Sequence, residues 1–135
     1  MNALLRFYFS FKYCLGLGGH LAEIRTIEEE RSLDDNLPDA VYWIGLTDEF
    51  QEGEFRWFSD LQPVSYSNWK IGEPNNLKNE GYDDQDENCV SKNQFFDSND
   101  PFKWNDLPCN TDSLWYEEHG WIGISALCQL QKNNV

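Results

Sequence analysis

The chain has 135 residues, of which 40% are hydrophobic and 16% aromatic, and its formal net charge at pH 7 is −14. This length suits one domain with a hydrophobic core, and so many aromatic side chains are not typical of a disordered chain. Nucleic acids and anionic membranes are excluded as partners, because binding either of them requires a basic surface. No window approaches the ~20 consecutive apolar residues of a transmembrane helix.

The N-terminal segment is predicted to form a helix. Apolar residues recur at helical spacing from Leu4 to Leu15, and Gly18-Gly19 supplies a stop, so we expect this helix over residues 3–17. Arg6 interrupts the apolar start and no small-residue cleavage site follows it. The segment therefore lacks the pattern of a signal peptide.

A second helix is predicted from a capping signal. Thr26 is followed three residues later by Glu29, a capping box in which each side chain satisfies a backbone N–H of the first turn. The helix is expected to run to Asp35 and to stop before Pro38. Residues 20–24 are expected to be a short extended link between the two helices.

The chain after the second helix is predicted to form short strands. Residues 41–46 are an unbroken apolar run, as expected of a strand buried on both faces. Further strands are expected over residues 54–58, 88–95, 101–107 and 121–130. Residues 62–88 have little periodicity and are too long for a simple connection, which indicates a functional loop. Two helices followed by several short strands predict an α+β fold.

Acidity is concentrated between Glu73 and Asp106. This stretch holds nine carboxylates and three lysines, a net charge of −6 out of the −14 of the chain. Carboxylate and amide oxygens are the ligands that Ca2+ prefers in proteins, so we predict a calcium site here. An EF-hand is excluded, because Cys89 and Phe95 stand where such a loop requires Gly and Glu.

The four cysteines indicate disulfides. Cys14, Cys89, Cys109 and Cys128 contain no Cys-x-x-Cys pair, and the two histidines are distant from them in sequence, which argues against zinc. An even number of cysteines without metal spacing predicts two disulfides and an oxidising compartment. Three connectivities are compatible with four cysteines, and the spacing does not select one.

Several motifs follow one another along the chain in a characteristic order. They are Tyr13-Cys14, residues 18–24, Trp43-Ile44-Gly45-Leu46, Asp48 to Glu52, Glu73-Pro74-Asn75-Asn76, Glu87-Asn88-Cys89-Val90, Trp104-Asn105-Asp106, Cys109 and Cys128. Together they resemble the C-type lectin domain. The resemblance implies a C-type lectin-like fold over residues 13–131, with residues 1–12 as an atypical or truncated N-terminal segment. It also implies two helices, short antiparallel strands, a long irregular loop region and the disulfides Cys14–Cys128 and Cys89–Cys109.

The resemblance also implies which residues bind calcium. The principal site would be formed by Glu73, Asn75, Glu87, Asn105 and Asp106, with Pro74 in a cis peptide. An auxiliary site would use Asp48, Glu52, Asn76 and Asn88 together with the shared Glu87. Asn88 stands where the family more often has Asp, which lowers the ligand charge by one. Glu80, in the long acidic run, is a reserve candidate for the role of Glu87.

The Glu-Pro-Asn motif resembles that of mannose-type members, whereas galactose-type members carry Gln-Pro-Asp. The implied function is calcium-dependent binding, without catalysis, of mannose, GlcNAc, glucose or fucose through two adjacent equatorial hydroxyls. The same residues of the principal site would contact the sugar: Glu73, Asn75, Glu87, Asn105 and Asp106. Partners would be glycans or glycoproteins with such terminal sugars, a homo-oligomer would supply multivalency, and the location would be secreted or extracellular.

Two alternative functions compete with this one. A calcium-independent protein-binding module of the same fold would typically lack the ligand residues that this chain keeps. For glycoside hydrolysis the chain has enough carboxylates. That reaction needs one protonated and one ionised carboxyl group, and nothing in the sequence indicates that two of them differ in pKa.

The insertion at residues 110–120 departs from the family pattern, since it lengthens the segment between Cys109 and Cys128. Trp115 and Tyr116 would either extend the sugar-binding surface by ring stacking or pack against the domain, and packing is the expectation.

Overall fold

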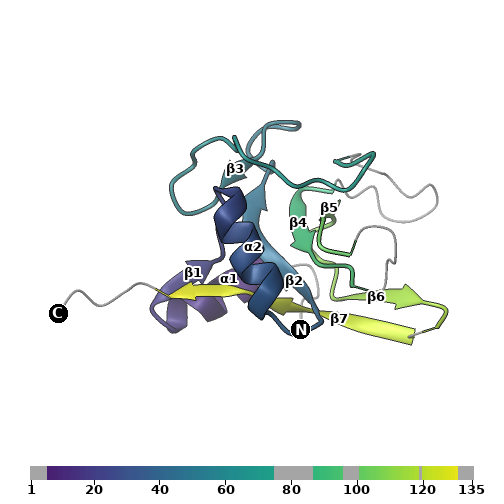
Figure 1. The fold of residues 1–135 in the computed structure, drawn as a ribbon. Helices are drawn as coiled ribbons and strands as arrows, with labels where there is room; N and C mark the ends of the chain where they lie inside the picture. Colours follow the sequence, from purple (N-terminus) through teal and green to yellow (C-terminus); the bar gives the residue numbers. More distant parts are fainter. Residues whose placement is uncertain (1–5, 75–86, 96–100, 119, 131–135) are drawn as a thin grey trace.

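The computed structural model describes residues 6–74, 87–95, 101–118 and 120–130 (Figure 1). The helices are α1 (Arg6–Gly16) and α2 (Ile27–Asn36). The strands are β1 (Gly19–Leu21), β2 (Val41–Thr47), β3 (Arg56–Trp57), β4 (Cys89–Lys92), β5 (Trp104–Leu107), β6 (Ser113–Tyr116), β7 (Gly120–Ala126) and β8 (Cys128–Leu130). Neither described helix is long and apolar enough to span a membrane.

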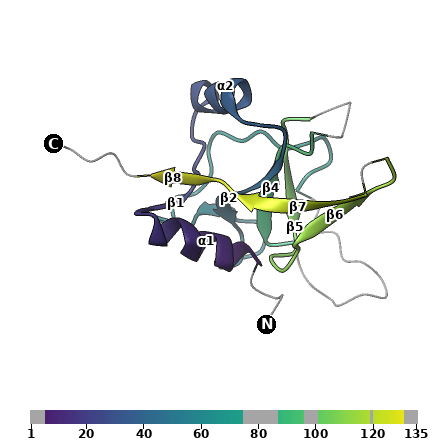
Figure 2. The ribbon, with the colours of Figure 1, turned by 90° about the horizontal axis from the view of Figure 1, so that it is seen from below.

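The sheet is built around β2. Its strand order is β5-β4-β2-β7-β6, with β3 also pairing to β2, while β1 and β8 form a separate antiparallel pair. All seven residues of β2 are buried, which confirms the expectation from its unbroken apolar sequence. The helices α1 and α2 lie on opposite sides of this sheet (Figure 2). The β2–β7 pair is parallel, an exception to the antiparallel pairing expected for this fold.

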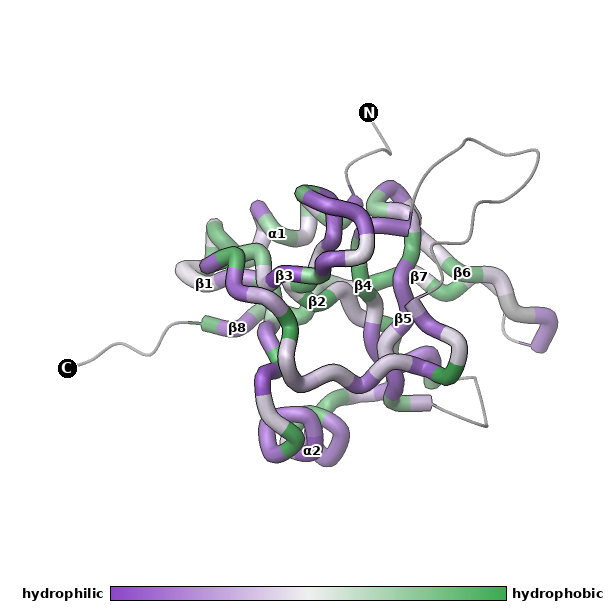
Figure 3. Tube along the Cα trace, turned by 90° about the horizontal axis from the view of Figure 1, so that it is seen from above, coloured by the Kyte–Doolittle hydropathy of each residue, from purple (hydrophilic) through white to green (hydrophobic). Residues whose placement is uncertain are grey.

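Both predicted helices form. In α1, the buried Phe7 packs edge-on against Trp43 of β2, with ring centroids 5.7 Å apart. At the start of α2, the Thr26 hydroxyl accepts the Glu29 N–H at 3.1 Å, as the capping box predicts. The capping box also predicts that the Glu29 carboxylate accepts the Thr26 N–H. It accepts the N–H of the preceding residue, Arg25, at 3.4 Å instead. The rest of α2 is mostly hydrophilic, in keeping with a solvated outer face (Figure 3).

The C-terminal strand prediction is wrong in one respect, since residues 121–130 form two strands. The chain changes sheets at Leu127, whose N–H donates to Trp43 O at 3.4 Å and whose carbonyl accepts the Ala22 N–H at 2.7 Å. The expected link at residues 20–24 contains β1, and the strand predicted at 54–58 is reduced to β3. β6 was not predicted, because its sequence follows no clear alternation of polar and apolar residues.

The two disulfides pair as the resemblance implies. Cys14–Cys128 joins α1 to β8, and Cys89–Cys109 joins β4 to the segment after β5. All four cysteines belong to one apolar cluster with Phe7 and Trp43. A second apolar cluster, around Trp57 and Trp104, lies under the long loop. The two clusters lie on either side of β2, which contributes to both.

A buried lysine joins α2 to the sheet. Lys92 of β4 is fully buried, and its ammonium group contacts the carboxylate of Glu30, that of Asp34 at 2.7 Å and the carbonyl of Phe102 at 3.1 Å. Tyr66, from the long loop, donates its hydroxyl to Glu30 at 3.3 Å. Burial and the negative charge of Glu30 raise the pKa of Tyr66 to about 12. The Lys92 ammonium group thus joins α2 to β4, and Tyr66 joins the long loop to the same Glu30 carboxylate.

Replacing this lysine is expected to destabilise the fold strongly. Lys92→Met removes the partner of the Glu30 carboxylate, which is 2% exposed, and an unpaired buried charge costs ~3–5 kcal/mol. Urea denaturation with both disulfides intact measures this loss. Arg56→Met, which breaks the exposed pair with Glu54, is the control and should cost less than ~1 kcal/mol. Adding Glu30→Gln to Lys92→Met should recover part of the lost stability, because it removes the unpaired charge. Equal losses in Lys92→Met and Arg56→Met would contradict the prediction.

Candidate metal centre

Three carboxylates from separate segments meet beside the start of β4. They belong to Glu73 in the long loop, Glu87 two residues before β4, and Asp106 in β5, and their oxygens lie within 4.8 Å of one another. Asp106 and Glu87 are buried, at 0% and 8% exposed, and Glu73 is half-buried. Like charges this close repel, so the group has the character of a cation site.

The backbone explains how the three residues come together. In the β4–β5 ladder, Val90 pairs with Asp106, which brings the end of β5 next to the segment that carries Glu87. The long loop is tied to β5 by hydrogen bonds from the Lys70 N–H to the Trp104 carbonyl and from the Glu73 N–H to the Lys70 carbonyl, both at 2.9 Å. The peptide bond that follows, Glu73–Pro74, is cis, as the resemblance implies.

The types of donor atom in this group fit calcium. The three carboxylates offer only hard oxygen ligands, and the nearby sulfur of Cys89 is occupied in a disulfide. Asn105 lies next to Asp106 on β5 with a half-buried side chain. Asn75, the remaining predicted ligand, lies outside the described residues, as does the reserve candidate Glu80.

Two predicted ligands of the auxiliary site also lie together. The Asp48 N–H donates to the Asn88 carbonyl at 3.1 Å, and Asp48 Oδ2 accepts the Gly53 N–H at 2.9 Å. Asp48 Oδ1 and Asn88 Oδ1 are buried and have no hydrogen-bond partner among the described residues. Unpartnered buried oxygens are unfavourable, so a bound cation would stabilise both. Glu52 is exposed on the neighbouring loop, and Asn76 lies outside the described residues.

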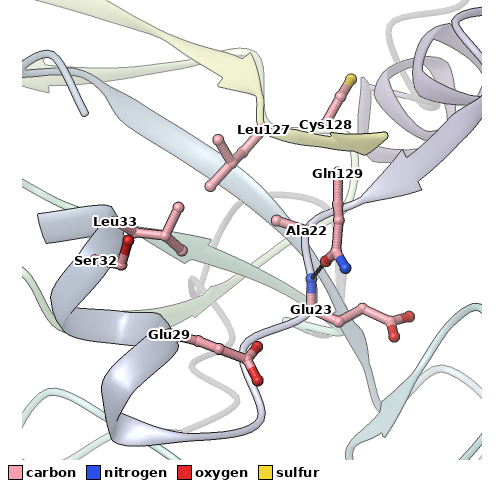
Figure 4. A pocket seen from close by; sticks show the side chains of 8 residues that line it. All are labelled: Ala22, Glu23, Glu29, Ser32, Leu33, Leu127, Cys128 and Gln129. Carbon is pink, nitrogen blue, oxygen red and sulfur yellow. Dashed lines mark hydrogen bonds between the residues drawn. The ribbon is translucent and has the colours of Figure 1, made fainter. Parts of the chain in front are cut away.

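A separate cavity lies between α2 and β8 (Figure 4). Its volume is 400 Å³, and it is lined by Ala22, Glu23, Glu29, Ser32, Leu33, Leu127, Cys128 and Gln129. The Glu23 carboxylate already contacts Arg25 at 2.6 Å and accepts the Ser59 hydroxyl. None of the predicted calcium ligands is among these lining residues, so the cavity is distinct from the carboxylate group described above.

Comparisons with known proteins agree with this fold. The profile of the Lectin C-type domain matches residues 4–116. The perlucin-like protein of Mytilus galloprovincialis is 38% identical over 110 residues, which cover 78% of this chain and 64% of that protein. The mannose-binding protein of Gallus gallus is 37% identical over 103 residues, which cover 76% of this chain and 35% of that protein. The chain therefore spans less than two thirds of the length of these curated relatives.

Solved structures with the same fold include carbohydrate-recognition domains. The cow C-type carbohydrate-recognition domain of CD23, solved in the presence of a GlcNAc2Man3 oligosaccharide, is 33% identical with a TM-score of 0.69, covering 94% of this chain and 81% of that one. The mouse scavenger receptor C-type lectin carbohydrate-recognition domain is 31% identical with a TM-score of 0.65, covering 79% of this chain and 76% of that one. A calcium-independent type II antifreeze protein is 27% identical with a TM-score of 0.60, covering 78% of this chain and 71% of that one.

The fold, its two disulfides and the converging carboxylates define a C-type lectin-like binding module. The chain belongs to the Lectin C-type domain family. Members of this family are binding proteins and not enzymes, and the chain is classed with them.

The repulsion among the three carboxylates predicts an effect of Glu87→Gln without any metal. In buffer with EDTA, this change removes one of three close negative charges, so the free energy of unfolding should rise by up to about 1 kcal/mol. Thermal or urea denaturation of both proteins measures it. Glu117→Gln changes an exposed carboxylate by the same chemistry and should have almost no effect. A variant less stable than wild type in EDTA would show that Glu87 is held by favourable contacts instead.

Proposed function

We propose that the chain binds carbohydrates of the mannose type through a calcium ion held by Glu73, Asn75, Glu87, Asn105 and Asp106. The observation that carries this proposal is the convergence of the Glu73, Glu87 and Asp106 carboxylates within 4.8 Å. Three buried or half-buried negative charges in one place are unfavourable unless a cation neutralises them. Family membership supports the same conclusion, since C-type lectin domains typically bind calcium.

The ligand residues would also select the sugar. A bound calcium would accept lone pairs from two adjacent sugar hydroxyls. Each hydroxyl would then donate its proton to a carboxylate, Glu73 on one side and Glu87 on the other, and accept a hydrogen bond from the neighbouring amide, Asn75 or Asn105. Adjacent equatorial hydroxyls with this geometry occur in mannose, GlcNAc, glucose and fucose. The chicken relative is a mannose-binding protein, and the cow domain was solved in the presence of a mannose-containing oligosaccharide.

Binding through two hydroxyls is expected to be weak, near millimolar or ~4 kcal/mol for one sugar. Several domains that bind one glycan surface together would raise the overall affinity. We therefore propose a homo-oligomer that recognises glycans or glycoproteins outside the cell. A structural neighbour, the Kupffer cell C-type lectin receptor Clec4f, is trimeric; it is 29% identical with a TM-score of 0.63. The domain that carries this function is proposed to span residues 13–131, and the two disulfides suit an oxidising, extracellular location.

The proposal predicts retention on mannose-agarose in calcium and elution by EDTA. Glu87→Gln should abolish retention, because it removes a ligand charge, replaces a charged hydrogen-bond acceptor by a weaker neutral one and introduces an NH2 group that cannot bind calcium. The double variant Glu73→Gln, Asn75→Asp, which reproduces the Gln-Pro-Asp motif, should move retention from mannose to galactose. Asp112→Asn serves as a control on the exposed surface. Retention that persists in EDTA would contradict the proposal and favour a calcium-independent module, as in the antifreeze relative.

Binding is also expected to weaken in mild acid. Calcium ligands must be deprotonated, so protons compete with the ion as the pH falls toward the ordinary pKa of Glu, about 4.3. Mannose binding should therefore decline between about pH 7.5 and about pH 4.5, and a higher calcium concentration should shift the decline to lower pH. Calorimetry at fixed calcium measures the effect. A flat profile over this range would contradict a carboxylate-held ion.

A further inference from the structure

The insertion at residues 110–120 contains β6, which forms a hairpin with β7. Ser113 pairs with Gly123 and Tyr116 with Gly120, and Gly120 takes the positive φ of 71° that closes the turn. Figures 1 and 2 both show this hairpin running out from the edge of the sheet. It belongs to neither of the two candidate cation sites.

Two tryptophans face solvent on one side of the hairpin. Trp115 and Trp121 are directly opposite each other and are 58% and 69% exposed. Their ring centroids are 5.5 Å apart and their planes are inclined at 59°. The expectation that Trp115 packs against the domain is therefore wrong, because its partner is the other exposed ring. Exposed aromatic pairs of this kind mark interaction surfaces.

The backbone beside this pair is also open. The Ile124 N–H donates to the Asp112 carbonyl at 3.0 Å, so by antiparallel alternation the N–H and C=O groups of Ser113 and Trp115 point away from β7. β6 ends the strand order, and within the described residues no backbone hydrogen bond reaches its outer edge. The opposite edge of the sheet is covered, since the backbone N–H of Trp104 in β5 donates to the Asn68 carbonyl at 2.8 Å.

Negative charge surrounds the open edge. Asp112 lies at one end of β6, where it pairs with Arg6 at 3.4 Å, and the exposed Glu117 and Glu118 form the turn at the other end. A second copy of the chain, paired antiparallel along β6, would bring the Asp112–Arg6 pair of one copy near the two glutamates of the other, and it would add no net positive charge. With −14 on each copy, this arrangement is repulsive. The surface therefore suits a partner of positive charge.

We propose that the β6 edge binds an extended basic segment of another protein. The segment adds a strand to β6 through the backbone of Ser113 and Trp115, a known mode of peptide recognition. The residue that pairs with Trp115 has its side chain on the same face as the two rings, so a Lys or Arg there makes cation–π contacts with both. The exposed carboxylates of Glu117 and Glu118 pair with the basic residues at the turn end of the segment. This proposal is independent of calcium and of sugar binding.

A sugar is a less suitable occupant of the same surface. The inclination of 59° between the Trp115 and Trp121 rings denies a pyranose one flat stacking platform. A sugar would also leave the open backbone edge of β6 unused. The wedge between two inclined rings instead matches a compact cationic head group, which is attracted to both ring faces.

The experiment uses fluorescein-labelled Arg-Thr-Arg-Thr-Arg-Thr as the probe, with Glu-Thr-Glu-Thr-Glu-Thr as the matched acidic peptide. Fluorescence anisotropy is measured on the full chain in EDTA, so that the cation sites do not contribute. The wild type is expected to bind the Arg peptide and not the Glu peptide. Trp115→Ser should weaken binding by about tenfold, the size of a lost cation–π contact. Phe9→Ser, which removes an aromatic side chain 66% exposed on α1, is the control and should change nothing.

Two further variants separate the edge from the rings. Ser113→Pro removes an outward N–H without touching the β6–β7 ladder, so the exciton-coupled circular dichroism of the tryptophan pair should survive while peptide binding falls. Glu117→Gln with Glu118→Gln should weaken binding and reduce its salt dependence. Unchanged peptide binding in the Trp115 variant would overturn the proposal. So would a Trp115-dependent binding of labelled mannan in EDTA, or a dimer in sedimentation that this variant dissociates.

Discussion

The antiparallel register of β4 with β5 is the constraint on which the rest of the structure depends. Because side chains alternate between the faces of a strand, a slip of one residue would turn Asp106 away from Glu87 and Glu73. The same register places Cys89 beside Leu107, close to the disulfide with Cys109 that fixes both strands. Asp106 of the candidate metal centre is therefore fixed on a paired strand, Glu87 is held two residues before β4, and only Glu73 comes from the long loop. Sites held in this way lose little free energy to ordering when a ligand binds.

Charge is distributed unevenly between the two ends of β4. At its start, Glu87 joins the carboxylates of Glu73 and Asp106, and at its end the buried Lys92 contacts the carboxylates of Glu30 and Asp34. One end of β4 thus pairs acids with a lysine, and the other gathers three carboxylates. Clusters of like charge beside a well-paired core are common in ligand-binding proteins, in which function and stability make different demands on neighbouring residues.

The sequence predicted the parts of the fold that local rules determine. The apolar run of β2 and the Thr26 cap of α2 are local signals, and the structure confirms both. The family motifs predicted the two disulfides and predicted that Glu73, Glu87 and Asp106 bind one ion, and the structure contains both disulfides and brings the three carboxylates together. The change of sheet at Leu127 could not be predicted, since it depends on hydrogen bonds to Trp43 and Ala22, which are distant in sequence. The burial of Lys92 could not be predicted from the sequence either, because it depends on Glu30 and Asp34, which belong to α2.

The Cys14–Cys128 disulfide has a mechanical consequence. It joins α1 to β8 across 114 positions of the sequence, so a tensile force applied to the chain outside these two cysteines travels through one covalent bond. The strands between them, β4 and β5 included, would carry none of that load. The candidate site would therefore keep its geometry when the chain is pulled, and extension of the chain would stop at this bond until it is reduced.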